Sequence, residues 1–275
     1  MATVPRGFAR LERRGPVMTL TLDEPDSLNR FHSENQFVEL AEQVRAAGDD
    51  PSVGVLVVTG AGRAFCAGGD IRSMAKREGF SAGSIEEIQE RYRRSIHQLP
   101  RALHGLDIPT IAAVNGPAYG AGCDLACYCD IRLASSEATF CMSFARIGLI
   151  PGDGGAWILP RLVGRSRAME LIFTARVVDA QEALRIGLVS QVLQPDTLLA
   201  EAGRLAESIA RHPREVLRMA KRLVRGAEET GLDTHLESVS AFQAIAHVSE
   251  AHRAAADATM RRLSGEADAG AGSAE

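Results

Sequence analysis

Apolar runs along this chain alternate with tight turns built from glycine and alanine, which we call corners. The clearest apolar run leads directly into the clearest corner. Residues 111–114 form a short apolar run of the kind found in fully buried strands, and Asn115-Gly116-Pro117 ends it. Gly120-Ala121-Gly122 follows, and apolar residues from Cys123 onward predict a buried helix. A strand, a corner and a helix leave the first N–H groups of the helix free to face a cavity. Such a corner can hold negative charge.

A second corner of the same kind occurs earlier. The apolar run 53–58 leads into Ala67-Gly68-Gly69, whose small side chains let a ligand approach the main chain. Two corners that each offer one N–H group would form an oxyanion hole, which stabilises charge developing on a carbonyl oxygen. The alternative is that both corners are ordinary strand-to-helix turns of an α/β fold.

Residue spacing predicts further elements on both sides of these corners. Alternation over 17–22 is typical of a half-buried strand. Ser33 and Gln36 have the spacing of a capping box at the start of a helix. The polar segment 73–84 predicts a surface loop, and the C-terminal third is helical, with one long helix over 232–263.

Composition narrows the class of protein without indicating an activity. The chain has 275 residues, is 45% hydrophobic and carries a formal net charge of -4. These values favour one domain with a sizeable core and argue against general nucleic-acid binding. The N-terminal segment has no apolar stretch typical of a secretion signal, and no run approaches the roughly 20 apolar residues of a membrane span. We therefore expect a cytoplasmic protein that binds neither nucleic acid nor membranes.

The cysteines and histidines suggest no metal site. Cys123 and Cys127 are one helical turn apart, but no fourth ligand follows at a spacing typical of zinc sites. Because all five cysteines lie in apolar segments, we interpret them as buried, reduced thiols. The seven histidines are scattered, and the sequence assigns none of them a role.

Four longer motifs resemble those of the crotonase superfamily, the enoyl-CoA hydratases and isomerases. They are AFCAGGDI at 64–71, AAVNGPAYGAGCDLACYCDIRLAS at 112–135, FARIGLIPGDGGAWILPRLVG at 144–164 and ALRIGLVSQVL at 183–193. The resemblance covers roughly residues 8–260, with the motifs in the order of the family.

The resemblance implies an α/β fold in which repeated β-β-α units form a spiral, followed by a C-terminal helical region. We expect a core over 1–195, a helical oligomerisation region over 196–263, and a disordered tail over 264–275. It also implies a homotrimer or a dimer of trimers that uses a coenzyme A thioester as its substrate and needs no other cofactor.

The resemblance further implies roles for individual residues. The N–H groups of Gly69 and Ala121 would bind the thioester oxygen, and Arg72 would lie near the CoA phosphates. The implied substrate-binding residues are Leu28, Arg30, Ala67, Arg72 and Phe144.

The acid and base positions depart from the hydratase pattern. Hydratases of the family carry one glutamate three residues after the second oxyanion donor and another about twenty residues later. Here these positions hold Asp124 and Phe144, and a phenylalanine can neither hold water nor transfer a proton. Asp153, in the sequence PGDGG, is a candidate for the lost carboxylate, although aspartate beside glycine is also a common turn residue.

Three functions remain open from the sequence. The first is double-bond isomerisation of an enoyl-CoA, with Asp124 and Asp153 as proton carriers. It ranks first because it needs only an oxyanion hole for the enolate and a proton carrier. The alternatives are a hydrolase that cleaves a carbon–carbon bond of a diketone and a catalytically weakened relative of the enzymes.

Overall fold

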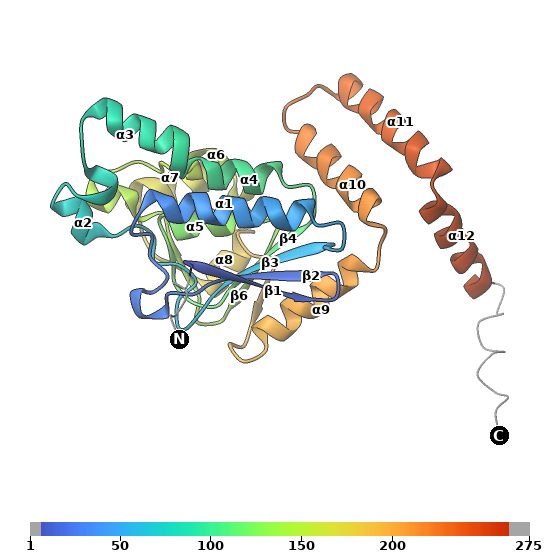
Figure 1. Cartoon of the computed structure of the whole chain (residues 1–275), viewed down its shortest axis with the longest axis horizontal. Helices are drawn as coiled ribbons and strands as arrows, with labels where there is room; N and C mark the ends of the chain where they lie inside the picture. Colours follow the sequence, from blue (N-terminus) through green and yellow to red (C-terminus); the bar gives the residue numbers. More distant parts are fainter. Residues whose placement is uncertain (1–6, 264–275) are drawn as a thin grey trace, which may run out of the picture. The chain divides into compact units, whose positions relative to one another are not determined.

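The structure is a computed structural model that describes residues 7–263 (Figure 1). The chain divides into two compact units, the first ending at Arg211 and the second beginning at His212. The sheets and the pocket described below lie in the first unit. α9 (Leu198–Ala210) follows residue 195 and also belongs to this unit, so the first unit extends beyond the expected end of the core.

A six-stranded sheet runs through the first unit in the order β1-β2-β3-β4-β6-β9. β1 (Ala9–Arg14) and β2 (Val17–Leu22) form an antiparallel hairpin, and the remaining neighbours pair in parallel. The parallel strands are β3 (Val55–Gly60), β4 (Thr110–Val114), β6 (Ile131–Ser135) and β9 (Gln191–Leu193). Because the carboxyl ends of parallel strands meet at one edge of the sheet, the corners after β3 and β4 are brought to the same edge.

Helices cover both faces of this sheet. Leu56 and Val58 face the larger core, to which α1 (Glu34–Asp49), α4 (Gln98–Gly105) and α5 (Ala121–Cys127) contribute. Val55 and Val57 pack instead with residues of α9, which lies on the other side of the sheet in Figure 1. Burial on both faces explains why the parallel strands read as continuous apolar runs. β2 is also more buried than the half-buried strand expected from its alternation, because α9 covers its second face.

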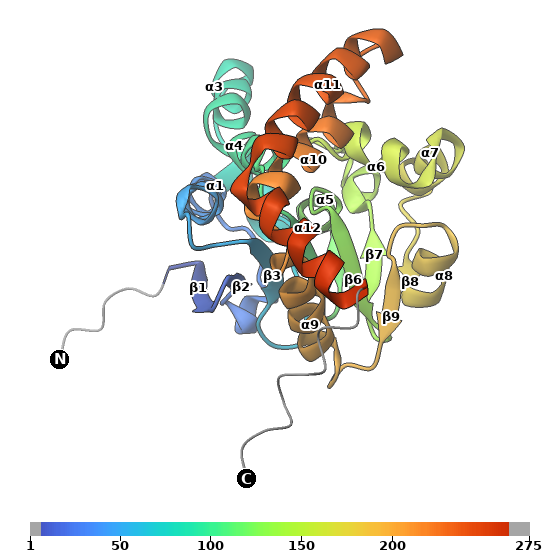
Figure 2. The ribbon, with the colours of Figure 1, turned by 90° about the vertical axis from the view of Figure 1, so that its right-hand side faces the viewer.

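A second, three-stranded sheet lies beside the first. β5 (Ala118–Tyr119) pairs with β7 (Thr139–Cys141), which pairs with β8 (Val178–Asp179). α8 (Ala180–Arg185) contacts this sheet and lies next to β8 and β9 in Figure 2. α6 (Gly155–Val163) and α7 (Arg165–Thr174) pack against each other, and α6 also packs on α5.

The segment expected to be a surface loop contains short helices. α2 (Ile71–Ala75) begins after Asp70, whose side chain accepts a hydrogen bond from the Arg72 N–H, and a 3-10 turn follows at Gly79–Ser81. α3 (Ile85–Arg91) then continues into a π-helical turn at Tyr92–Ile96. The expected loop is thus present but contains helical turns, which the sequence did not indicate because α2 has five residues, too few for a periodic pattern.

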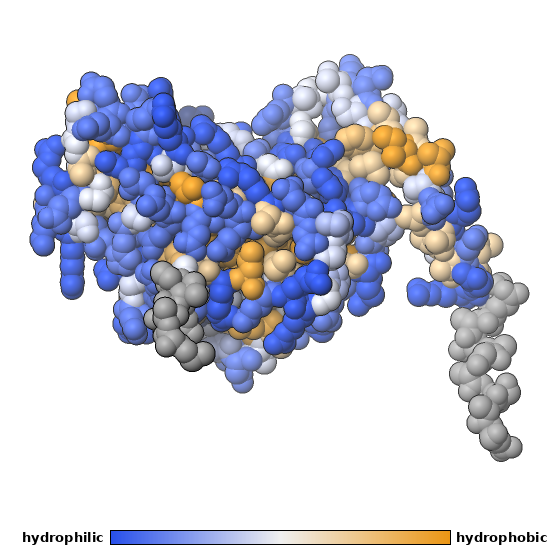
Figure 3. Space-filling model, in the orientation of Figure 1, coloured by the Kyte–Doolittle hydropathy of each residue, from blue (hydrophilic) through white to orange (hydrophobic). Residues whose placement is uncertain are grey.

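The second unit is helical. Its helices are α10 (Arg214–Gly226), α11 (Leu232–Val248) and α12 (Glu250–Leu263). The long helix expected over 232–263 is interrupted at Ser249, which is extended at ψ 147 and whose hydroxyl accepts a hydrogen bond from the His252 N–H. Apolar side chains gather along α11 and α12 in Figure 3. The expected disordered tail lies outside the described residues.

Candidate active site

One pocket lies at the edge of the sheet where both corners meet. It encloses about 520 Å³, part of it open to solvent. Both predicted oxyanion donors, Gly69 and Ala121, line it together with Asp153. The complete lining is Phe37, Ala67, Gly69, Ile71, Met74, Phe80, Tyr92, Ile96, Gly120, Ala121, Ser143, Phe144, Ile147, Leu149 and Asp153. The pocket is thus mainly apolar, with two main-chain donors and one carboxyl.

Main-chain contacts hold the two corners against each other. The Tyr119 N–H donates to the Cys66 carbonyl at 2.9 Å. Gly68 adopts φ +84, and a Cβ added there would lie 2.6 Å from the Tyr119 oxygen and 3.6 Å from the Ala121 nitrogen. At Gly122, a Cβ would lie 2.1 Å from the Cys66 oxygen. Both positions require glycine because the corner after β3 packs directly on the start of α5.

The N–H groups of Gly69 and Ala121 are free to bind a ligand. Across residues 7–263, neither group donates a hydrogen bond to another residue. The neighbouring peptides, by contrast, are fixed: the Phe31 N–H donates to the Gly68 carbonyl, and the Asp70 N–H donates to the Phe31 carbonyl. Two free donors on rigid backbone at one pocket are the arrangement that stabilises an oxyanion.

Asp153 is the carboxyl within the pocket lining. Its side chain is buried, with 8% of the residue exposed. Burial disfavours the charged form and raises the pKa of Asp153 from 3.8 to about 7. A carboxyl with a pKa near neutrality can both accept and return a proton.

Asp124 lies deeper than Asp153. It projects from α5, is 1% exposed and is not among the residues that line the pocket. Burial, and then the charge of Asp153, raises the pKa of Asp124 well above its usual value. Neither carboxyl oxygen has a hydrogen-bond partner in the described part of the chain, so the facing Gly155 N–H offsets little of this cost. Burial and the neighbouring Asp153 carboxylate therefore both disfavour the ionised form of Asp124.

The glycines of PGDGG allow the Asp153 loop to pack closely on its surroundings. A Cβ at Gly155 would lie 2.1 Å from Asp124 Oδ1. Gly154 adopts φ +92, and a Cβ there would lie 2.1 Å from the Tyr128 hydroxyl. Only glycine fits at these two positions without moving the neighbouring side chain. The motif thus places the Asp153 side chain at the pocket. The backbone of its two following glycines packs against Asp124 and Tyr128.

By the resemblance described above, Phe144 takes the place of the second glutamate of the hydratases. It lies in a 3-10 turn at Ser143–Ile147, and a Cβ at Gly120 would lie 3.7 Å from its ring. The ring therefore forms an apolar wall next to the corner that bears the Ala121 N–H.

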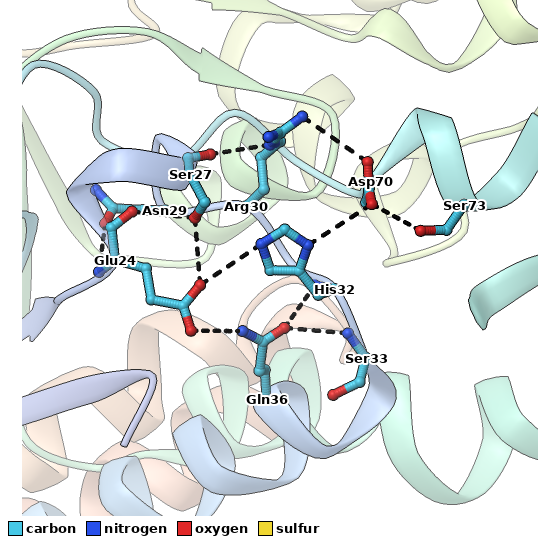
Figure 4. A network of polar contacts seen from close by, with 9 residues as sticks. All are labelled: Glu24, Ser27, Asn29, Arg30, His32, Ser33, Gln36, Asp70 and Ser73. Atoms are coloured by element: carbon cyan, nitrogen blue, oxygen red, sulfur yellow. Dashed lines mark hydrogen bonds and ion pairs between the residues drawn. The ribbon is translucent and has the colours of Figure 1, made fainter. Parts of the chain in front are cut away.

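Two of the implied CoA-binding residues, Leu28 and Arg30, lie in the turn after β2, next to the first corner. The Leu28 carbonyl accepts a hydrogen bond from the Ala67 N–H at 3.0 Å, which joins the turn after β2 to the first corner. Arg30 donates to the Ser27 carbonyl and lies 3.8 Å from the Asp70 carboxylate, which His32 also faces at 3.7 Å (Figure 4). Of these implied residues, Ala67 lines the pocket itself, while Arg72 is exposed on α2.

Several pocket residues were missed by the sequence analysis. Tyr92 lines the pocket from the π-helical turn, and burial raises the pKa of its hydroxyl to about 12, so that it stays protonated. Phe37 also lines the pocket, and Met74 and Phe80, from the segment expected to be a surface loop, lie against Gly69. The spacing of apolar residues along a sequence does not distinguish a pocket lining from a core.

The cysteines are free and buried, as expected. Over residues 7–263, no group of three or more histidine, cysteine or carboxyl side chains is placed to hold a metal ion. No helix in that range is long and apolar enough to cross a membrane.

Known proteins share this sequence and fold over nearly the whole chain. The family model for enoyl-CoA hydratase/isomerase matches residues 12–260. The chain is 38% identical to the 1,2-epoxyphenylacetyl-CoA isomerase of Escherichia coli K12, over 90% of this chain and 93% of that protein. It is 36% identical to the crotonyl-CoA hydratase of Syntrophomonas wolfei, over 86% of each chain.

Solved structures agree with this result. The putative enoyl-CoA hydratase of Streptomyces coelicolor superposes with a TM-score of 0.87 at 30% identity, covering 95% of this chain and 94% of that one. The enoyl-CoA hydratase of Bacillus anthracis gives a TM-score of 0.85 at 29% identity, with coverage of 93% and 96%. The chain has the crotonase fold and belongs to the enoyl-CoA hydratase/isomerase family of enzymes.

Proposed function

We propose that this enzyme moves the double bond of an enoyl-CoA thioester, with Asp153 as the proton carrier. The observation that supports this most strongly is the position of Asp153. A buried carboxyl with a pKa near 7 lines the same pocket as two free N–H groups, while Phe144 replaces the glutamate needed to hold water. The acyl-CoA thioester is the only other component that the reaction needs.

The proposed reaction has two proton transfers. The thioester oxygen binds to the N–H groups of Gly69 and Ala121, which makes the hydrogens on the adjacent carbon more acidic. Ionised Asp153 removes one of these protons, and the resulting enolate charge is held by the two donors. Asp153 then returns the proton two carbons further along the acyl chain, and the double bond becomes conjugated with the thioester. Each oxyanion donor contributes roughly a hundredfold to a thousandfold in rate.

Asp124 has a supporting part in this proposal. Because its side chain does not line the pocket, it does not exchange protons with the substrate directly. Burial raises the pKa of Asp124 as well, and of the two carboxyls Asp153 is the one that lines the pocket.

The pocket supports an apolar acyl group. Aromatic and aliphatic side chains form its wall, and the Tyr92 hydroxyl lies close to Asp153. One relative acts on an aromatic acyl-CoA by its name, the 1,2-epoxyphenylacetyl-CoA isomerase, and another on the short crotonyl-CoA. We propose that acyl chains with bulky apolar ends are accepted.

The second unit supports association between copies of the chain. α11 and α12 expose large apolar side chains, among them Leu232, Leu236, Ile245 and Val248. We propose that these helices assemble the chain into a homotrimer or a dimer of trimers, which light scattering coupled to size-exclusion chromatography would distinguish. A monomeric particle would contradict this part of the proposal.

The function is tested with one pair of substrates. The purified enzyme is supplied with a 3-enoyl-CoA and, separately, with crotonyl-CoA, and the absorbance of the conjugated enoyl thioester is followed. We expect the conjugated product to appear from the 3-enoyl-CoA and the crotonyl-CoA signal to persist. Rapid loss of the crotonyl-CoA signal by hydration would contradict the proposal, and inactivity on both substrates would favour the diketone hydrolase or the weakened relative.

A further inference from the structure

A histidine outside the pocket lining holds the loop that carries Asp153. His97 lies between the π-helical turn and α4, and its Nε2 atom is 3.0 Å from the Gly152 carbonyl oxygen. Since a carbonyl oxygen can only accept, Nε2 carries the proton and donates this hydrogen bond. The bond fixes the peptide group that immediately precedes Asp153.

The two sides of Asp153 are held differently. On the far side, the Gly154 carbonyl accepts from the Trp157 and Ile158 N–H groups at the start of α6 and from the Tyr128 hydroxyl at 3.2 Å. On the near side, within the part of the chain that the structure describes, the Gly152 carbonyl accepts from His97 alone. Loss of the His97 donor would therefore free one side of the loop, whereas loss of the Tyr128 hydroxyl would leave the other side attached to α6.

The surroundings of His97 keep its ring in place. The Tyr92 ring packs edge-on against it, with 5.8 Å between ring centroids. The same tyrosine contacts Gly152, where an added Cβ would lie 2.7 Å from the Tyr92 ring. The His97 N–H also donates to the Tyr92 carbonyl at 2.9 Å, which closes the π-helical turn. This irregular turn brings a pocket residue and the histidine against one loop, and such turns are frequent at functional sites.

We propose that His97 is a positioning residue that sets the place of the Asp153 carboxylate relative to the oxyanion donors through its hydrogen bond to Gly152. This inference rests on the proposed role of Asp153. The Ala121 N–H and Tyr128 belong to α5 and the residue after it, so the oxyanion side and the far side of the loop share one rigid support. His97 ties the near side to a different support, the π-helical turn. A misplacement of about 1 Å in a reacting group can cost about a hundredfold in rate.

The test compares two substitutions at one position. His97→Gln keeps an N–H donor that can reach the Gly152 carbonyl, whereas His97→Leu fills similar space without a donor. We expect His97→Leu to lower kcat for the 3-enoyl-CoA about tenfold to a hundredfold with KM changed less than about threefold. His97→Gln should recover most of the lost kcat. His104→Leu, on α4 with its ring against Trp157, is the matched control and should retain kcat within about twofold.

Binding and the aspartate variant separate the possible failures. The affinity for butyryl-CoA, a saturated thioester that cannot isomerise, should be the same in wild type and both His97 variants, because the oxyanion donors are unaffected. Wild-type kcat in His97→Leu, or equal losses in His97→Gln and His97→Leu, would overturn the positioning role. Turnover retained in Asp153→Asn would instead overturn the proposed function.

Discussion

Burial of Asp153 has a cost that can be measured in the stability of the protein. Raising the pKa of a carboxyl from 3.8 to about 7 corresponds to about 4 kcal/mol of differential free energy between its two protonation states. Asp153→Asn removes the ionisation and keeps the shape of the side chain. The substitution therefore removes the cost of charging this group, together with its repulsion of the Asp124 carboxylate.

The sign of the effect follows from proton binding. Between the unfolded and folded pKa values, the folded protein holds a proton on Asp153 that the unfolded chain has released, so stability falls as the pH rises and levels off above about 7. Over about pH 5 to pH 8, the wild type should lose about 3 kcal/mol more than Asp153→Asn does. The variant should therefore be the more stable protein at about pH 8, and its advantage should shrink toward acidic pH.

Urea denaturation of both proteins at matched concentration gives this difference directly. A single pH series, followed by circular dichroism at about pH 5, 6, 7 and 8, is sufficient. Parallel stability curves for the two proteins would mean that Asp153 is ionised in the fold across this range, and the reasoning about its pKa would be refuted. A variant that is less stable at about pH 8 would have the same meaning.

Four further outcomes are expected. The wild-type kcat/KM for a 3-enoyl-CoA should rise with pH through about 7, since Asp153 must be ionised to accept a proton; a profile flat from about pH 5 to 9 would exclude it as the base. Asp124→Asn should lower kcat less than Asp153→Asn does, and an equal loss would bring Asp124 into the proton transfer. Phe144→Glu should increase the hydration of crotonyl-CoA, whereas Phe144→Leu should not; equal rates in a folded Phe144→Glu variant would show that the phenylalanine does not limit hydration. Gly122→Ala should destabilise the fold by about 1–3 kcal/mol or more because its Cβ would meet the Cys66 oxygen, while the control Gly105→Ala, with open space around it, should unfold at the same or a higher temperature.

Sequence patterns predicted the parts of the fold that depend on local chemistry. The run 111–114 is a fully buried strand, α5 is buried along its whole length, and Gln36 accepts a hydrogen bond from the Ser33 N–H at the start of α1. In each case, a short stretch of residues determines the element through its own spacing and side chains.

The features that depend on distant contacts were not predicted. The second buried face of β2 depends on α9, which is about 180 residues further along the chain. The burial that raises the pKa of Asp153 comes from how its loop packs, and the turn composition of PGDGG could not show it. His97 acts through a carbonyl 55 positions away, so no local pattern marks it.

The division between main-chain and side-chain chemistry explains how one family can carry out several reactions. The two oxyanion donors are backbone N–H groups whose positions depend on close packing at Gly68 and Gly122, and changes in the reacting side chains leave them in place. By the resemblance and the proposed mechanism, the positions that can hold a proton carrier lie on α5, on the turn that holds Phe144 and on the Asp153 loop, and the last two line the pocket. A carboxyl can therefore be lost at position 144 and gained at position 153 without disturbing the oxyanion hole. In the proposed mechanism, the reaction is decided by which support holds an ionisable group that reaches the pocket, and in this chain Asp153 on its loop lines the pocket.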